Sequence, residues 1–154
     1  MLSISGFLGI MVTPQLSWNP KINLDISEQY RWEKRILLIF SPTQTNRQLV
    51  EQRSWFFKNR VGFNDRDLLV IEIVNNIVLS RFPALAGKRK TPFFRSQFRV
   101  NQNKFRSILI GKDGSIKLDR SIPIDPCYLF GLIDSMPMRR QEIYNNGDPV
   151  RCVK

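Results

Sequence analysis

The stretch RILLIFSPTQTNRQLVEQ, residues 35–52, decides the fold. In its first part, residues 35–40, a continuous apolar run follows Arg35, which is typical of a strand covered on both faces. Pro42 ends this strand, and Thr45 and Gln48 have the spacing of a capping box, so a helix is expected to begin there and to end at Gly62. The helix is expected to bury a stripe formed by Leu49, Val50, Phe56 and Phe57.

A second apolar run, residues 68–74, predicts a buried strand, and strand, helix and strand form a right-handed βαβ unit. Residues 75–92 contain Pro83, Gly87 and Pro92 and are expected to form a long loop, with a short helical turn near Leu79. A short helix is expected around Phe94.

Residues 105–118, FRSILIGKDGSIKL, predict a β-hairpin, because Asp113-Gly114 suits a tight turn between two apolar segments. Asp125 and Pro126 then supply an N-cap and a first-turn proline for a last helix, which Pro137 is expected to end. Its buried stripe is expected to be Leu129, Phe130, Ile133 and Met136.

This order predicts one α/β domain, a mixed sheet of about four strands with helices on both faces. We expect an irregular lead-in or export segment over residues 1–29, the domain over residues 30–142, and a polar tail over residues 143–154.

The chain is strongly basic, with a formal net charge of +11. Residues 73–112 contain no Asp or Glu and hold much of the excess, including the cluster at residues 88–90. Such a field attracts nucleic acid, acidic polysaccharide or anionic lipid, although a basic surface without a partner explains it equally well.

The chain has no histidine, which excludes Ser/His/Asp and Cys/His catalysis and the usual zinc sites. Cys127 and Cys152 are too few for a metal cluster, and no metal or cofactor is expected. They would form one disulfide that ties down the tail in an oxidising compartment, or remain two free thiols.

Residues 1–13 are apolar, like the central part of a signal peptide, but no Lys or Arg precedes them, so the sequence leaves both a cytoplasmic and an exported location open. The run is shorter than the roughly 20 residues that cross a bilayer, and no membrane span is expected.

Four segments, YRWEKRILLIFSP, RDLLVIEIV, FRSILIGKDGSIKL and LFGLIDSMPMRRQE, together resemble the family catalogued as domain of unknown function 4174. This is a bacterial domain, similar to one in vertebrate extracellular proteins of the sushi-repeat and coiled-coil-domain-containing kind. The resemblance implies a thioredoxin-like three-layer sandwich related to peroxiredoxins, with no established reaction.

In a thioredoxin-like fold, the reactive cysteine would lie in the loop after the first central strand, where the helix dipole lowers the thiol pKa. Here that loop, residues 41–46, is SPTQTN and has no sulfur, so thiol-dependent redox catalysis is not expected.

The leading hypothesis is therefore a binding or interaction module for an anionic partner, such as an anionic polymer or acidic surface. Its candidate binding residues are Arg47, Lys112, Asp113, Arg139 and Arg140. For Lys112 and Asp113 a plain exposed turn is the alternative, and for the two arginines, neutralisation of a helix dipole.

The alternative is an oxidoreductase-like enzyme of peroxiredoxin-like ancestry with a polar, cysteine-free site. Its candidate catalytic residues are Thr45, Gln52, Arg66 and Asp67, for which a capped helix and a surface ion-pair cluster are the structural explanations.

Overall fold

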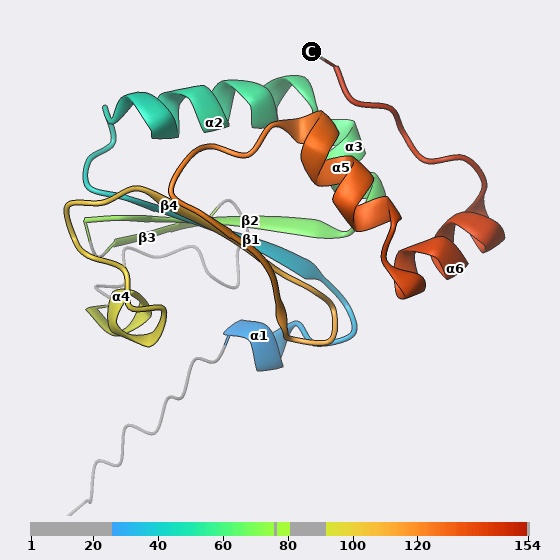
Figure 1. Ribbon diagram of the computed structural model, residues 1–154, viewed down its shortest axis with the longest axis horizontal. Helices are drawn as coiled ribbons and strands as arrows, with labels where there is room; N and C mark the ends of the chain where they lie inside the picture. Colours follow the sequence, from blue (N-terminus) through green and yellow to red (C-terminus); the bar gives the residue numbers. More distant parts are fainter. Residues whose placement is uncertain (1–25, 76, 81–91, 154) are drawn as a thin grey trace, which may run out of the picture.

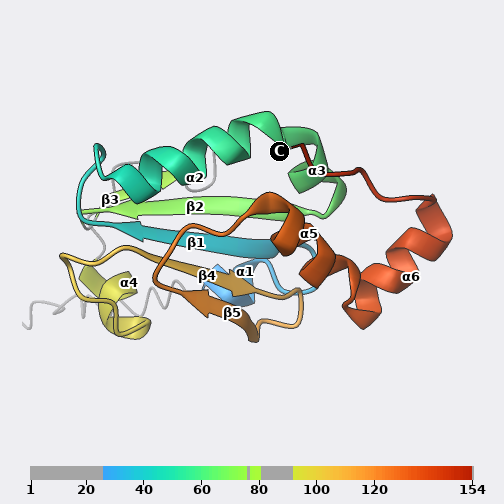
Figure 2. The same ribbon diagram turned by 45° about the horizontal axis from the view of Figure 1, so that its top comes forward.

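The computed structural model describes residues 26–75, 77–80 and 92–153 (Figure 1). Its centre is a mixed sheet of order β3-β2-β1-β4-β5. Strand β1 is parallel to β2, and every other neighbouring pair is antiparallel (Figure 2). The strands are β1 (Arg35–Ser41), β2 (Leu68–Val74), β3 (Ile77–Ser80), β4 (Arg106–Ile110) and β5 (Ile116–Arg120).

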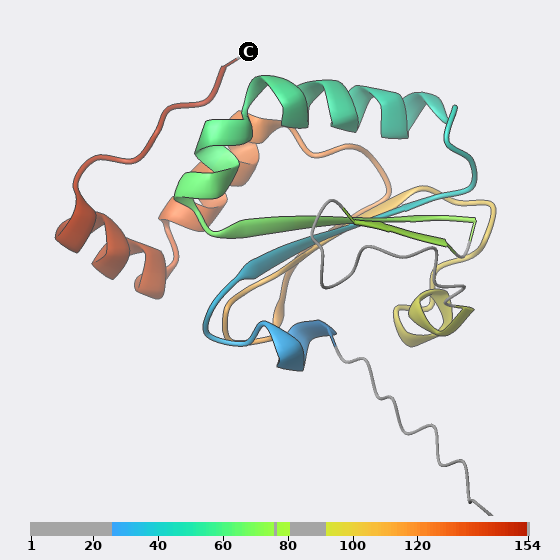
Figure 3. The ribbon, with the colours of Figure 1, turned by 180° about the vertical axis from the view of Figure 1, so that it is seen from behind.

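Helices cover both faces of the sheet, which confirms the expected layers (Figures 1 and 3). One face carries α2 (Arg47–Lys58), α3 (Arg60–Asp65) and α5 (Pro126–Asp134). The other carries α1 (Ile26–Gln29) and α4 (Pro92–Gln97), and α6 (Pro137–Asn146) lies beyond the end of the sheet where β1 begins.

Strand β1 is apolar from Ile36 to Phe40 because both of its faces are buried. Leu37 and Ile39 pack in the cluster that α2 and α5 cover, whereas Ile36, Leu38 and Phe40 pack in the cluster on the opposite face. All five are at most 1% exposed. The continuous apolar run in the sequence therefore correctly predicted a doubly covered strand.

The sheet has five strands and not about four, because residues 77–80 form β3. Leu79 lies in this strand opposite Glu72, so the expected helical turn there is wrong. Pairing with β2 satisfies backbone groups that a helical turn would have satisfied locally. The basic cluster at residues 88–90 lies outside the described residues.

Helix α2 begins later than the capping-box pattern predicted, and it buries a different face. Asn46 is the N-cap, and its Oδ1 accepts hydrogen bonds from the backbone N–H groups of Gln48 and Leu49. Leu49 and Gln52 are buried, whereas Val50 and Phe57 are 52% and 71% exposed, so their expected burial is wrong.

Gly62 does not stop a helix but lies inside α3. A side chain there would meet the ring of Phe130, because a Cβ atom would come within 2.6 Å of the Phe130 Cζ. Close packing of α3 against α5 explains this glycine, which the sequence pattern had assigned to a helix end.

The C-terminal region also differs from the expectation. Helix α5 is capped by Asp125 and buries Leu129, Phe130 and Ile133, as predicted. Pro137, however, begins α6 instead of ending α5, since proline fits the first turn of a helix. Helix α6 runs to Asn146, past the expected start of the polar tail at residue 143.

Within the described residues, we find no helix long and apolar enough to cross a membrane.

Candidate functional site

The loop between β1 and α2 lies at the carboxyl end of the two parallel strands. Thr43 and Thr45 are exposed, with hydroxyl oxygens 3.5 Å apart, and the Ser41 hydroxyl donates to the Thr43 carbonyl. No imidazole can activate these hydroxyls, since the chain lacks histidine. The loop ends at Asn46, which caps α2.

A buried guanidinium supports this loop from below. Arg95 on α4 is 5% exposed and donates to the carbonyls of Ser41 at 2.6 Å and Asn101 at 2.9 Å. It has no carboxylate partner among the described residues, and burial lowers its pKa. An uncompensated positive charge thus lies under the loop.

Exposed cations surround the same end of the sheet. They are Arg47 at the start of α2, Arg99 and Lys104 before β4, and Arg120 at the end of β5. None of them makes an ion pair within the described part of the chain. We call these four residues, with Arg95 and the loop of residues 41–46, the cationic end.

The carboxylates nearest this end are mostly neutralised. Asp119 pairs with Arg106 at 2.5 Å, and Glu72 pairs with Arg53 at 2.6 Å. Glu51 is exposed on α2 without an ion pair in the described region, so it offsets only part of the charge. The cationic end therefore keeps a positive field that an anion would feel.

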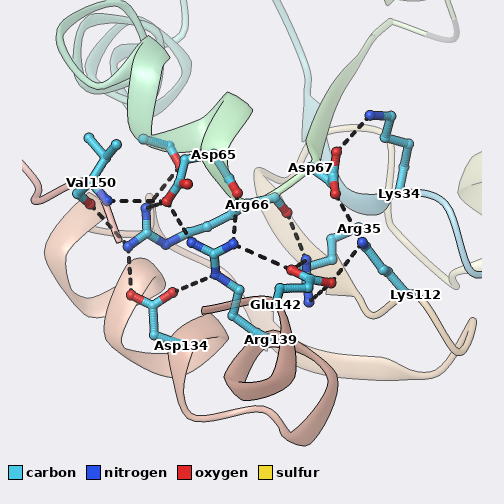
Figure 4. Close-up of polar contacts among 11 residues, drawn as sticks. Lys34, Arg35, Asp65, Arg66, Asp67, Lys112, Asp134, Arg139, Glu142 and Val150 are labelled. Carbon is cyan, nitrogen blue, oxygen red and sulfur yellow. Dashed lines mark hydrogen bonds and ion pairs between the residues drawn. The ribbon is translucent and has the colours of Figure 1, made fainter. Parts of the chain in front are cut away.

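An ion-pair network occupies the opposite end of the sheet, where β1 and β2 begin and β4 ends (Figure 4). Arg35, which is 1% exposed, holds both oxygens of Glu142 at 3.1 Å, and Lys112 binds the same carboxylate at 2.8 Å. Lys112 also binds Asp67 at 2.9 Å, and Asp67 binds Lys34 at 2.9 Å.

Arginines form the other half of this network. Arg66 donates to Asp134 at 2.6 Å, and Arg139 donates to Asp65 at 2.6 Å and to Asp134 at 3.2 Å. Every cation in the network has a carboxylate partner, so these positive charges are largely neutralised by ion pairs within the protein. The network joins α6 and the residues just before β2 to this end of the sheet. We assign it a structural role.

Two small pockets lie beside the network. One, of about 180 Å³, is lined in part by Tyr30, Lys34 and Asp67, and the other, of about 190 Å³, by Lys112, Lys117 and Met136. The cations that line them are already paired, which leaves little net charge for a ligand.

The pKa values of two network carboxylates are lowered. Burial alone would raise the pKa of Asp67, but hydrogen bonds from Lys34 and Lys112 hold it below its usual value. Burial would likewise raise the pKa of Glu142, but hydrogen bonds from Arg35 and Lys112 outweigh this effect and lower it. Both carboxylates are therefore charged in the folded protein at neutral pH.

These lowered pKa values predict acid sensitivity. A carboxylate with a depressed folded-state pKa stabilises the fold above its unfolded-state pKa, about 4, and this contribution is lost as pH falls through the folded-state value. We expect the free energy of unfolding to fall between about pH 5 and pH 3, and Glu142→Gln to flatten that fall. Urea titrations across this range measure it, with exposed Glu51→Gln as the control; equal acid slopes in both variants would contradict it.

The sequence candidates fall into separate groups in the structure. Thr45 lies at the cationic end, and Gln52 is buried on α2, where its amide pairs with the backbone N–H and carbonyl of Ile124. Arg66 and Asp67 lie at the network end. The four candidates of the enzyme hypothesis therefore do not converge on one site.

The binding candidates are also divided. Arg47 belongs to the cationic end, whereas Arg140 is exposed on α6. Lys112 and Arg139 are 9% and 3% exposed within the network. The expected turn forms at residues 111–114, but the expected exposure of Lys112 is wrong. Arg139 lies in the first turn of α6 and not at the C-terminal end of a helix, so neutralisation of a helix dipole does not explain it. Asp113 is held in its turn by Ser115 and Lys117.

Arg66 also differs from its expected surface ion pair, because it is 1% exposed. Sequence reasoning missed Arg35, Arg95, Asp134 and Glu142 as site-forming residues. Of these, Arg35 could have been predicted from the sequence, since a cation at the start of a fully buried strand needs a polar or charged partner.

Cys127 and Cys152 form a disulfide with Cα atoms 5.2 Å apart, which settles the question that the sequence left open. It joins the first turn of α5 to the segment of residues 147–153, which we call the C-terminal strap. Val150 exchanges hydrogen bonds with Asp65 and Arg66, and Val153 does so twice with Asn59. Each hydrogen bond stabilises the bound strap by about 1 kcal/mol. The conformational entropy lost on ordering each strap residue costs roughly 1–2 kcal/mol.

The described residues contain no group of three or more Cys, Asp or Glu side chains arranged to hold a metal ion.

The sheet order, the parallel β1-β2 pair and the helices on both faces define a thioredoxin-like α/β protein. A solved structure with this fold is the reduced 2-Cys peroxiredoxin of Plasmodium vivax. It aligns with a TM-score of 0.54 and 15% identity over 74% of this chain and 83% of that chain. At this identity the likeness concerns the fold alone.

The chain belongs to the family described as domain of unknown function (DUF4174), whose model matches residues 26–142. It is 26% identical to the sushi repeat-containing protein SRPX of Rattus norvegicus, and 26% identical to that of Homo sapiens. Each match covers 75% of this chain and 26% of the relative, so the chain spans about a quarter of their length. The family resemblance seen in the sequence is thus confirmed.

Proposed function

We propose that this chain is a binding module for an anionic partner, which it holds at the cationic end. The observation that carries the proposal is the position of Arg47, Arg99, Lys104 and Arg120, which are exposed without ion pairs in the described residues. Loops at this end of an open α/β sheet commonly hold ligands. Here the loop supplies hydroxyl and backbone groups, and the cations supply charge.

Thiol catalysis is not part of the proposal. The loop contains no sulfur, and the two cysteines form a disulfide between α5 and the strap. The alternative polar-site enzyme needs Thr45 and Asp67 at one centre, whereas they lie at opposite ends of the sheet.

Charge removal tests this proposal. The triple variant Arg47→Ala/Lys104→Ala/Arg120→Ala is expected to bind heparin at least about tenfold more weakly at low salt, and with a shallower salt dependence. Affinity is measured by calorimetry across a series of salt concentrations, because counterion release makes each lost contact visible in the slope.

The matched control is Lys58→Ala/Arg60→Ala/Arg140→Ala, which removes the same charge from exposed positions away from the cationic end. We expect the control to keep most of the affinity. Equal losses in the two variants would mean diffuse attraction by net charge, and absence of binding by the unmodified chain would refute an anionic partner.

A further inference from the structure

The disulfide lies at the edge of the fold and not in its core. Cys127 in the first turn of α5 and Cys152 in the strap are both partly exposed, in contrast to the buried Leu129 and Phe130 that follow in α5. A reductant can therefore reach the bridge without unfolding of the sheet.

The strap depends on this bridge for its position. The side chain of Cys152 packs against the apolar cluster that α2 and α5 cover. The strap is otherwise held by backbone groups of Val150 and Val153, which bind side chains of Asn59, Asp65 and Arg66. The hydrogen bonds alone do not offset the entropy of ordering an extended segment without regular secondary structure. The covalent link removes much of that entropy in advance, because it ties the strap to α5.

We propose that Cys127–Cys152 is a reversible redox site that takes a dithiol as its reductant, and that release of the C-terminal strap is the result. A thiolate of the dithiol attacks one sulfur of the bridge and forms a mixed disulfide. The second thiol of the reductant then displaces the remaining cysteine. Two electrons pass to the protein, two protons end on Cys127 and Cys152, and the dithiol becomes a disulfide.

Release changes the surface over α3. Asn59 and Arg66 are 3% and 1% exposed while the strap is bound. When it leaves, the amide of Asn59 loses both of its contacts with Val153, and Arg66 loses the carbonyl of Val150. The reduced protein therefore presents new hydrogen-bonding groups and a free thiol at the start of α5, whereas the sheet keeps its contacts.

Hydrogen exchange of the full chain tests this proposal, before and after reduction by dithiothreitol, with reduction verified by thiol alkylation and mass. The amides of Val150 and Val153 are expected to exchange at least about tenfold faster after reduction. The amides of β1 and β4 are expected to stay protected, and reoxidation is expected to restore the strap.

Two variants separate the contribution of the disulfide to the protection of the strap from that of the hydrogen bonds. Cys127→Ser/Cys152→Ser is expected to reproduce the reduced pattern without a reductant. Asn59→Ala, which keeps the bridge, is expected to deprotect Val153 while Val150 stays protected. Protection of both strap amides after complete reduction would overturn the proposal, as would loss of protection in β1 or failure of dithiothreitol to reduce the bridge in the folded protein.

Discussion

Replacement of Arg66 by methionine is expected to lower the free energy of unfolding by about 3–5 kcal/mol, since it removes several buried, charge-assisted hydrogen bonds at once. The guanidinium lies 3.9 Å above the Phe130 ring and donates to Asp134, to the Val150 carbonyl and to the Gly62 carbonyl. Methionine fills much of the volume but supplies none of these donors.

Urea denaturation at pH 7 measures the loss, with Arg60→Met as the matched control. Arg60 is exposed and has no ion pair in the described residues, so its replacement is expected to change stability by less than about 0.5 kcal/mol. Lysine at position 66 is expected to recover only part of the loss, because a single ammonium cannot reproduce the forked contacts. A loss below about 1 kcal/mol for Arg66→Met would contradict the structural role of the network.

The second large effect is expected from Phe130→Ala, at about 3–5 kcal/mol. Phe130 is 3% exposed, its ring centroid lies 5.4 Å from that of Phe63, and it fills the space above Gly62. Its removal leaves a cavity between α3 and α5 and exposes one face of the Arg66 guanidinium.

Phe57→Ala is the matched control for this substitution, because Phe57 is 71% exposed on α2. We expect a change of less than about 0.5 kcal/mol from Phe57→Ala. Thermal unfolding monitored by circular dichroism compares the two variants. Similar losses at both positions would mean that α2 buries the face predicted from the sequence and not the face described above.

The strands were largely predictable because their signals are local. Residues 68–74 were predicted as a strand with the bounds that the structure shows, and the turn at Gly114 has the positive φ of 81° that such hairpins use. Strand β3 was missed because an edge strand of this length shows no clear alternation and depends on pairing with β2.

The face of α2 was not predictable from apolar spacing, because Gln52 occupies a core position. Its amide replaces an apolar contact with two hydrogen bonds to the Ile124 backbone, a partner distant in sequence. The pattern therefore favoured Val50 and Phe57, which are exposed.

The candidate sites were only partly predictable, because they too depend on partners that are distant in the sequence. Arg66, Lys112 and Arg139 were recognised as residues with suitable chemistry, but their partners come from segments far apart in the sequence. Nothing local shows that these charges neutralise one another while Arg47 and Lys104 remain free of ion pairs in the described region. Topology decides which cations are available to a ligand.

The most direct test of the central claim is an NMR titration of the ¹⁵N-labelled chain with a heparin-derived oligosaccharide. The account predicts amide shift changes at residues 41–47, 99–104 and 120, with little change at Lys34, Lys112 and Glu142. Changes centred on the ion-pair network, or spread evenly over the basic surface, would contradict it.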